Sequence, residues 1–141
     1  MRRIDPVIKA QAVADVVKVD YFVPGCPMDN QEFKRVLSAI LTGKQPFIPS
    51  YAVCVECKAQ ENECLYDYGT VCMGPVTRAG CGAACPSNGH YCFGCRGVVP
   101  DLNANAARDV MEKYKLSMHQ IRNCFYMFNS NYVELEEKRD E

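Results

Sequence analysis

The sequence has little of the features that mark several common protein classes. Its 16 basic and 17 acidic residues leave a net charge of −1, so it has no basic surplus of the kind that indicates nucleic-acid binding. No apolar run approaches the ~20 residues that span a bilayer. The basic start Arg2-Arg3 is not followed by the apolar region of a signal peptide. We therefore expect no nucleic acid, no membrane span and a cytoplasmic location.

Residue sets for catalysis are also missing. No Ser–His–Asp set, phosphate-binding loop or pair of catalytic carboxylates stands out. The acidic residues within the cysteine-rich part of the chain are irregularly spaced, which favours a solvated face: Glu56, Glu61, Glu63 and Asp67. The sequence thus predicts no catalytic centre within this chain itself.

Cysteine, by contrast, is abundant. Eight of the ten cysteines lie in one segment, in which two Cys-x-x-Cys pairs bracket four single residues: Cys54, Cys57, Cys64, Cys72, Cys81, Cys85, Cys92 and Cys95. Six glycines lie between them, and glycine lets the backbone turn sharply and approach closely. The segment has few large apolar residues, so we expect something other than an ordinary core to hold it together.

Three chemistries can use such a set of thiols. Disulfides suit secreted domains, and the expected reducing compartment weighs against them. Zinc commonly takes two Cys-x-x-Cys pairs per site or mixes cysteine with histidine, but this chain has only His90 and His119. Iron–sulfur clusters accept one close pair plus scattered thiolates. The pattern favours two four-thiolate iron–sulfur sites, and the alternatives are a zinc-stabilised interaction module or a two-cluster ferredoxin-like subunit of another oxidoreductase.

Periodicity predicts two elements before the first turn cysteine. Residues 4–16 are expected to form a short helix, and the alternating apolar residues of 17–23 to form a strand buried on one face. The tight turn Pro24-Gly25-Cys26-Pro27 follows. Its cysteine is either a buried thiol at a turn or a ligand at the end of a strand.

A well-patterned helix is predicted next, over residues 29–43. Asp29 is a suitable N-cap and Gly43 a suitable stop. Its apolar residues fall on one continuous stripe, made of Phe33, Val36, Leu37, Ile40 and Leu41.

After a loop over 44–53 and the cysteine-rich segment, two short helices are expected to close the fold. Their apolar faces consist of Ala107, Val110, Met111, Tyr114, Met118, Ile121, Phe125 and Phe128. Ser117 is placed to cap the second helix, and Cys124 beside its face is interpreted as a packed thiol. The charged tail 134–141 is expected to be a solvated end. The predicted class is a small α+β fold, with a strand–turn–helix unit, a loop-rich iron–sulfur segment and C-terminal helices.

Three ordered motifs resemble the small subunits of nickel–iron hydrogenases. They are VVKVDYFVPGCP at 16–27, GPVTRAGCGAACP at 74–86 and CFGC at 92–95. The resemblance extends over residues 15–100. It is closest to the cytosolic deazaflavin-reducing, methyl-viologen-reducing and sulfhydrogenase types. It implies an oxidoreductase subunit that relays electrons from the nickel–iron site of a large subunit, through [4Fe-4S] clusters, to a partner redox subunit.

The resemblance also implies which cysteines bind which cluster, although spacing alone leaves other pairings open. The distal cluster would be held by Cys54, Cys57, Cys64 and Cys72. The medial cluster would be held by Cys81, Cys85, Cys92 and Cys95. Cys26 would be one ligand of a third, proximal cluster that is shared with another chain.

The sequence departs from the family at its start. Family members begin with a flavodoxin-like domain that carries the other proximal ligands, and here no cysteine precedes Cys26. A second polypeptide, an absent proximal cluster and a longer parent product are three explanations. The resemblance divides the chain into 1–50, the end of a flavodoxin-like half, 51–100, the two-cluster segment, and 101–141, the C-terminal helices and tail. The implied partners are the large subunit, a chain supplying the missing N-terminal half, and a downstream flavin or iron–sulfur subunit.

Overall fold

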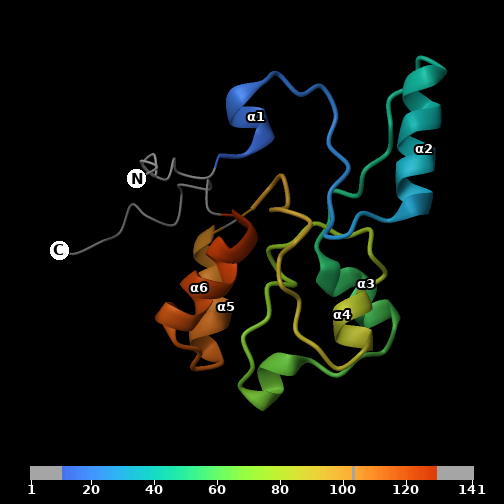
Figure 1. Ribbon diagram of the computed structural model, residues 1–141. Coiled ribbons are helices and arrows are strands. Elements are labelled where there is room, and N and C mark those ends of the chain that lie inside the picture. The colour runs from blue at the N-terminus through green and yellow to red at the C-terminus, as the bar shows by residue number, and fades with distance from the viewer. Residues whose placement is uncertain (1–10, 103, 130–141) are drawn as a thin grey trace, which may run out of the picture.

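The chain is a small, helix-rich fold whose elements are joined by long irregular segments (Figure 1). The computed structural model describes residues 11–102 and 104–129, and only the backbone for 104–108. The elements in chain order are α1 (Val13–Val16), α2 (Asn30–Leu41), α3 (Val53–Ala59), the 3₁₀ helix η1 (Leu65–Tyr68), α4 (Ala84–Ser87), α5 (Ala104–Lys113) and α6 (Met118–Asn129). No helix among the described residues is long and apolar enough to cross a membrane.

The predicted strand over 17–23 is not confirmed. Within the described part of the chain, residues pair only at isolated bridges, and none of these involves 17–23. A strand is stabilised by hydrogen bonds to a neighbouring strand, and no strand among the described residues pairs with this segment. The expected helix over 4–16 is seen only as α1, because residues 1–10 lie outside the described residues. The α+β class is therefore corrected to a helix-rich one.

The predicted helix after the turn is confirmed as α2. The Asp29 carboxylate accepts a hydrogen bond from the Glu32 N–H at 2.6 Å, which caps the helix. Gly43 follows in a left-handed conformation, with φ of +68°. The apolar stripe is formed but mostly uncovered: Val36 is buried, whereas Leu41 is 77% exposed. Figure 1 accordingly shows α2 at the periphery of the fold.

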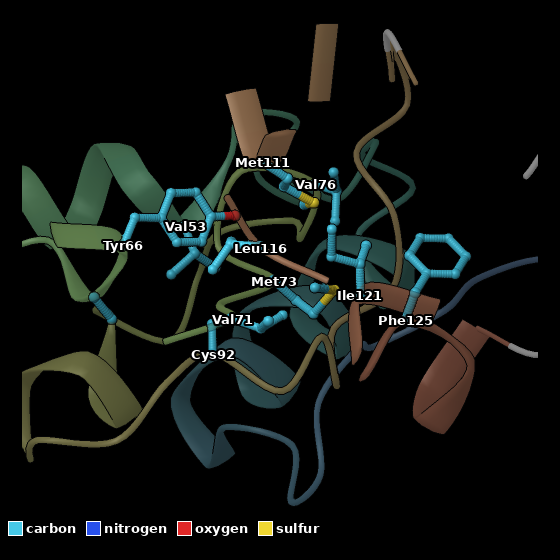
Figure 2. Packing of buried hydrophobic residues seen from close by; sticks show 11 residues of the cluster. Val53, Tyr66, Val71, Met73, Val76, Cys92, Met111, Leu116, Ile121 and Phe125 are labelled. Carbon is cyan, nitrogen blue, oxygen red and sulfur yellow. The ribbon is translucent and has the colours of Figure 1, made fainter. Parts of the chain in front are cut away.

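The core lies between the cysteine-rich segment and the two C-terminal helices (Figure 2). Its buried members are Val53, Tyr66, Val71, Met73, Val76, Ala83, Cys92, Met111, Leu116, Ile121 and Phe125. We expected the cysteine-rich segment to contribute few large apolar residues. More than half of the buried core side chains nevertheless come from it. They are buried because α5 and α6 pack over them, and Cys124 packs against the same cluster as expected.

Three short helices within 51–100 escaped the sequence patterns. They are α3, η1 and α4, which have seven residues or fewer. An amphipathic period needs several turns to become visible, and these helices are too short to show one. Both C-terminal helices were predicted correctly, and the charged tail 134–141 lies outside the described residues.

A buried ion pair joins α2 to the cysteine-rich segment. Arg96 donates to the two Glu32 carboxylate oxygens at 2.8 and 2.7 Å, and each side chain is only 2% exposed. The same guanidinium donates to the carbonyl oxygens of Ala79 and Pro24, both at 2.8 Å. Burial alone would lower the pKa of Arg96, but the hydrogen bonds and charge of Glu32 outweigh it and raise that pKa. The turn before Cys26, the start of α2 and the segment around Cys81 are therefore tied together by one side chain.

This pair generates a stability prediction. Glu32→Ala leaves a buried guanidinium without its carboxylate, which we expect to cost about 3–5 kcal/mol of the free energy of unfolding. Asp20→Ala is the control, because its ion pair with Lys18 is exposed, and it should change that free energy by no more than about 0.5 kcal/mol. Denaturant unfolding followed by circular dichroism measures both. Equal unfolding midpoints for the two variants would contradict the prediction.

Candidate metal centres

Short backbone pairings bring the cysteine motifs together. The Val53 N–H donates to the Thr77 carbonyl oxygen at 2.9 Å, and the Arg78 N–H to that of Gly97 at 3.0 Å. The stretch just before α3 therefore lies against 77–79, which in turn lies against 97–99. The first stretch adjoins Cys54, the second adjoins Cys81 and the third adjoins Cys95, so residues far apart in the sequence meet in one region.

The first four cysteines form one group. Cys54 and Cys57 lie one turn apart on α3, which places them on the same side of that helix. Burial is the largest cause that raises the pKa of Cys54 to about 12, and the next causes are the nearby thiols of Cys72, Cys57, Cys64 and Cys92. One thiol can raise the pKa of another in this way only if the two side chains lie close together.

Cys81, Cys85 and Cys95 form a second, more exposed group. Burial is the largest cause that raises the pKa of Cys85, and the nearby thiols of Cys95 and Cys81 raise it further. Cys92 is buried, which raises the pKa of its thiol to about 12, whereas Cys81 is exposed. The Cys92 N–H also donates to Cys72 Sγ at 3.3 Å. Cys92 therefore stands at the boundary, where the two groups touch.

The arrangement suits iron–sulfur clusters chemically. All ten thiols are free. No three His, Cys, Asp or Glu side chains among the described residues are gathered closely enough to hold a single metal ion. A four-iron cluster takes its thiolates at separate corners, so its ligands do not need to converge on a single atom. Thiols raised in pKa by burial and by one another would release protons when they bind such a group.

A glycine provides close backbone approach at the first group. A Cβ atom at Gly74 would lie 3.1 Å from Cys54 Sγ and 3.5 Å from Cys72 Sγ. The main chain therefore passes directly against two sulfur atoms, where a side chain would intrude. Sulfur atoms also accept hydrogen bonds from the protein, as Cys57 Sγ does from the Asn62 amide at 3.7 Å. The residues present thus fit the group that the sequence implied.

The other predicted site residues fall in different places. Cys26 is exposed, and so is not the buried thiol that was one of its two interpretations; its turn is closed by the bridge between Gly25 and Met28. His90 and His119 are exposed. These observations leave the role of Cys26 as a prediction.

The expectation for Glu56 is wrong, because its carboxylate is half-buried and accepts hydrogen bonds from two backbone N–H groups. Asn62 was missed as well, and only its position five residues after Cys57 could have suggested a sulfur contact. The ion pair of Glu32 with Arg96 carried no sequence signal, since its members are 64 residues apart.

Similarity to known proteins defines the class. No protein-family model matches the chain. The chain is 43% identical over 107 residues to the delta subunit of sulfhydrogenase 2 from Pyrococcus furiosus, which covers 75% of this chain and 45% of that protein. It is 40% identical over 116 residues to a vhu-type subunit of the F420-non-reducing hydrogenase from Methanocaldococcus jannaschii, which covers 67% of this chain and 40% of that protein. These relatives are subunits of hydrogenases, and hydrogenases are oxidoreductases.

A third relative has a more specific name. The chain is 32% identical over 120 residues to the iron-sulfur subunit of the F420-non-reducing hydrogenase from Archaeoglobus profundus, which covers 65% of this chain and 37% of that protein. The chain is thus homologous to part of these hydrogenase subunits, and the resemblance to the hydrogenase small-subunit type is confirmed. It spans less than half the length of these relatives.

The close approach at Gly74 generates a second prediction. Gly74→Ala places a methyl group against Cys54 and Cys72, so we expect less iron and acid-labile sulfide per chain. Gly69→Ala is the control: a Cβ there would meet nothing within 4 Å, and its left-handed φ costs about 1 kcal/mol of stability without touching a thiol. Iron content at the wild-type level in Gly74→Ala would refute the expectation.

Proposed function

We propose that this chain is an electron-transfer subunit of a cytoplasmic nickel–iron hydrogenase complex and that it binds two [4Fe-4S] clusters. The observation that carries the proposal is the meeting of eight free thiols in two adjoining groups, where burial and neighbouring thiols raise the pKa of Cys54, Cys72, Cys85 and Cys92. The names of the relatives support the same class. When bound, each cluster supplies one-electron redox chemistry. The reaction with hydrogen would belong to a large subunit, because the sequence of this chain predicts no catalytic centre of its own.

The proposed ligand sets follow the two groups of thiols. Cys54, Cys57, Cys64 and Cys72 would bind the distal cluster, and Cys81, Cys85, Cys92 and Cys95 the medial cluster. The chain's own residues would bury the sulfurs and donate N–H groups to them, and both effects tune a cluster's potential. The contact of Cys92 with Cys72 supports a short distance between the two sites.

The exposed apolar surface supports an obligate place in a complex. Side chains left open to solvent by this chain are Val13, Val16, Val17, Phe22, Phe33, Leu37, Leu41 and Phe47. Apolar exposure on this scale is typical of a protein interface. We assign residues 1–50 to the end of a flavodoxin-like half, 51–100 to the two-cluster segment and 101–141 to the C-terminal helices and tail. Another chain would supply the rest of that half.

The turn cysteine defines the proposed electron path. Cys26 is exposed, and Arg96, the residue after Cys95, donates to the carbonyl oxygen of Pro24 in the same turn. We propose that Cys26 completes a proximal cluster whose other ligands come from a different polypeptide, on the side of the large subunit. A flavin or iron–sulfur subunit would lie downstream of the distal site.

Metal content tests the proposal directly. Anaerobically prepared protein should contain about eight irons, with matching acid-labile sulfide, bound within residues 54–95. Elemental analysis and sulfide determination measure both quantities. Stoichiometric zinc with negligible sulfide would overturn the proposal in favour of a zinc-stabilised interaction module.

A substitution tests the path. In the assembled complex, Cys26→Ala should abolish hydrogen-dependent reduction of the clusters within 54–95, while dithionite still reduces them, because only the entry point is lost. Cys124→Ala is the control, since that thiol packs against the core and is only partly buried; it should leave both reductions intact. Reduction by hydrogen at the normal rate in Cys26→Ala would limit the turn to a structural role.

A further inference from the structure

Glu56 lies between the two cysteines of the first Cys-x-x-Cys pair but interacts with the other group of thiols. Its Oε1 accepts from the Gly80 N–H at 2.8 Å, and its Oε2 accepts from the Ala83 N–H at 3.2 Å. Cys81 Sγ lies 4.0 Å from the same Oε2. The carboxylate on α3 therefore reaches the loop that leads into α4, and Figure 1 shows these two helices side by side.

The loop that receives this carboxylate has an unusual backbone. Gly80, Gly82 and Ala83 have φ values of +117°, +62° and +52°. For alanine the left-handed conformation is unfavourable, and Ala83 is also completely buried. Backbone N–H groups in such conformations form a concave site for an anion. Here the anion is the Glu56 carboxylate, and its hydrogen bonds help to hold the strained loop that carries Cys81.

Within the part of the chain that the structure describes, no ion pair neutralises the charge of Glu56. Arg96 is the nearby cation, and the charges of Cys81 and Glu56 are the smaller causes that raise its pKa, after those from Glu32. However, its guanidinium already forms two hydrogen bonds with Glu32, at 2.7 and 2.8 Å. Glu56 is left with two neutral N–H donors, so a net negative charge remains beside Cys81.

We propose that Glu56 is a positioning residue for the second thiol group. It holds the 80–83 loop in the conformation that presents Cys81, and it places a fixed negative charge beside that sulfur. Adding an electron next to a carboxylate is unfavourable, so the charge lowers the reduction potential of a cluster bound by Cys81, Cys85, Cys92 and Cys95. The inference rests on the proposed function, because it requires clusters at both groups.

Two substitutions of Glu56 separate charge from shape. Glu56→Gln removes the charge and turns an amide group toward one of the two N–H donors. Glu56→Asp keeps the charge on a shorter side chain. Glu61→Gln is the matched control, since Glu61 is an exposed carboxylate on the same segment. The readouts are iron content and a redox titration of the assembled complex followed by electron paramagnetic resonance.

We expect Glu56→Gln to shift the signal of one of the two clusters within residues 54–95 to a more positive potential and to leave the signal of the other unchanged. Glu56→Asp should keep both potentials, with lower iron occupancy at one site because of its shorter reach. Glu61→Gln should match the wild type in both readouts. If Glu56→Gln loses a cluster, loss of about four irons with the other signal intact supports the positioning role.

Four results would overturn the inference. They are unmoved signals in Glu56→Gln, a shift of both signals together, loss of both clusters, and an equal shift in Glu56→Asp. A wild-type protein without iron–sulfur signals would refute the proposed function itself. Two normal clusters in the wild type with an unaffected Glu56→Gln would refute only the role of Glu56.

Discussion

The buried ion pair of Glu32 and Arg96 holds together parts of the chain that are far apart in the sequence. A guanidinium taken out of water must have its donors satisfied, and here a carboxylate and two carbonyl oxygens accept from it. Gly80 belongs to the same constraint, because a Cβ atom there would lie 2.3 Å from Arg96 Nη2. The pair thereby sets where the Cys26 turn and the Cys81 loop lie relative to each other.

The loop that carries Cys81 is held from two sides. On one side Arg96 donates to the Ala79 carbonyl oxygen, and on the other the Gly80 N–H donates to Glu56. Both anchors are charged groups that act on neutral backbone atoms, and such hydrogen bonds are stronger than neutral ones. A loop with several left-handed residues can therefore keep one conformation although Cys81 itself is exposed.

The two halves of the chain bury apolar surface very differently. The cysteine-rich segment shares a closed core with α5 and α6, centred on Met73 and Phe125. The N-terminal part leaves most of its apolar side chains in solvent, including most of the stripe on α2. Uncovered apolar surface is costly in water, and this asymmetry agrees with a chain that spans less than half the length of its relatives.

Local features of this protein could be predicted from its sequence: the cysteine pattern, the capped α2 helix, both C-terminal helices and the resemblance to hydrogenase small subunits. Each depends on residues close together in the chain, as Asp29 and Glu32 are. The contact of Cys92 with Cys72 and the binding of the Cys81 loop by Glu56 emerged only from the folded chain. Only the folded chain also showed that residues 17–23 do not form the predicted strand, because a strand requires a paired neighbour and the described residues provide none. Contacts between distant residues leave no periodic trace in a sequence, since they depend on how the chain folds back on itself.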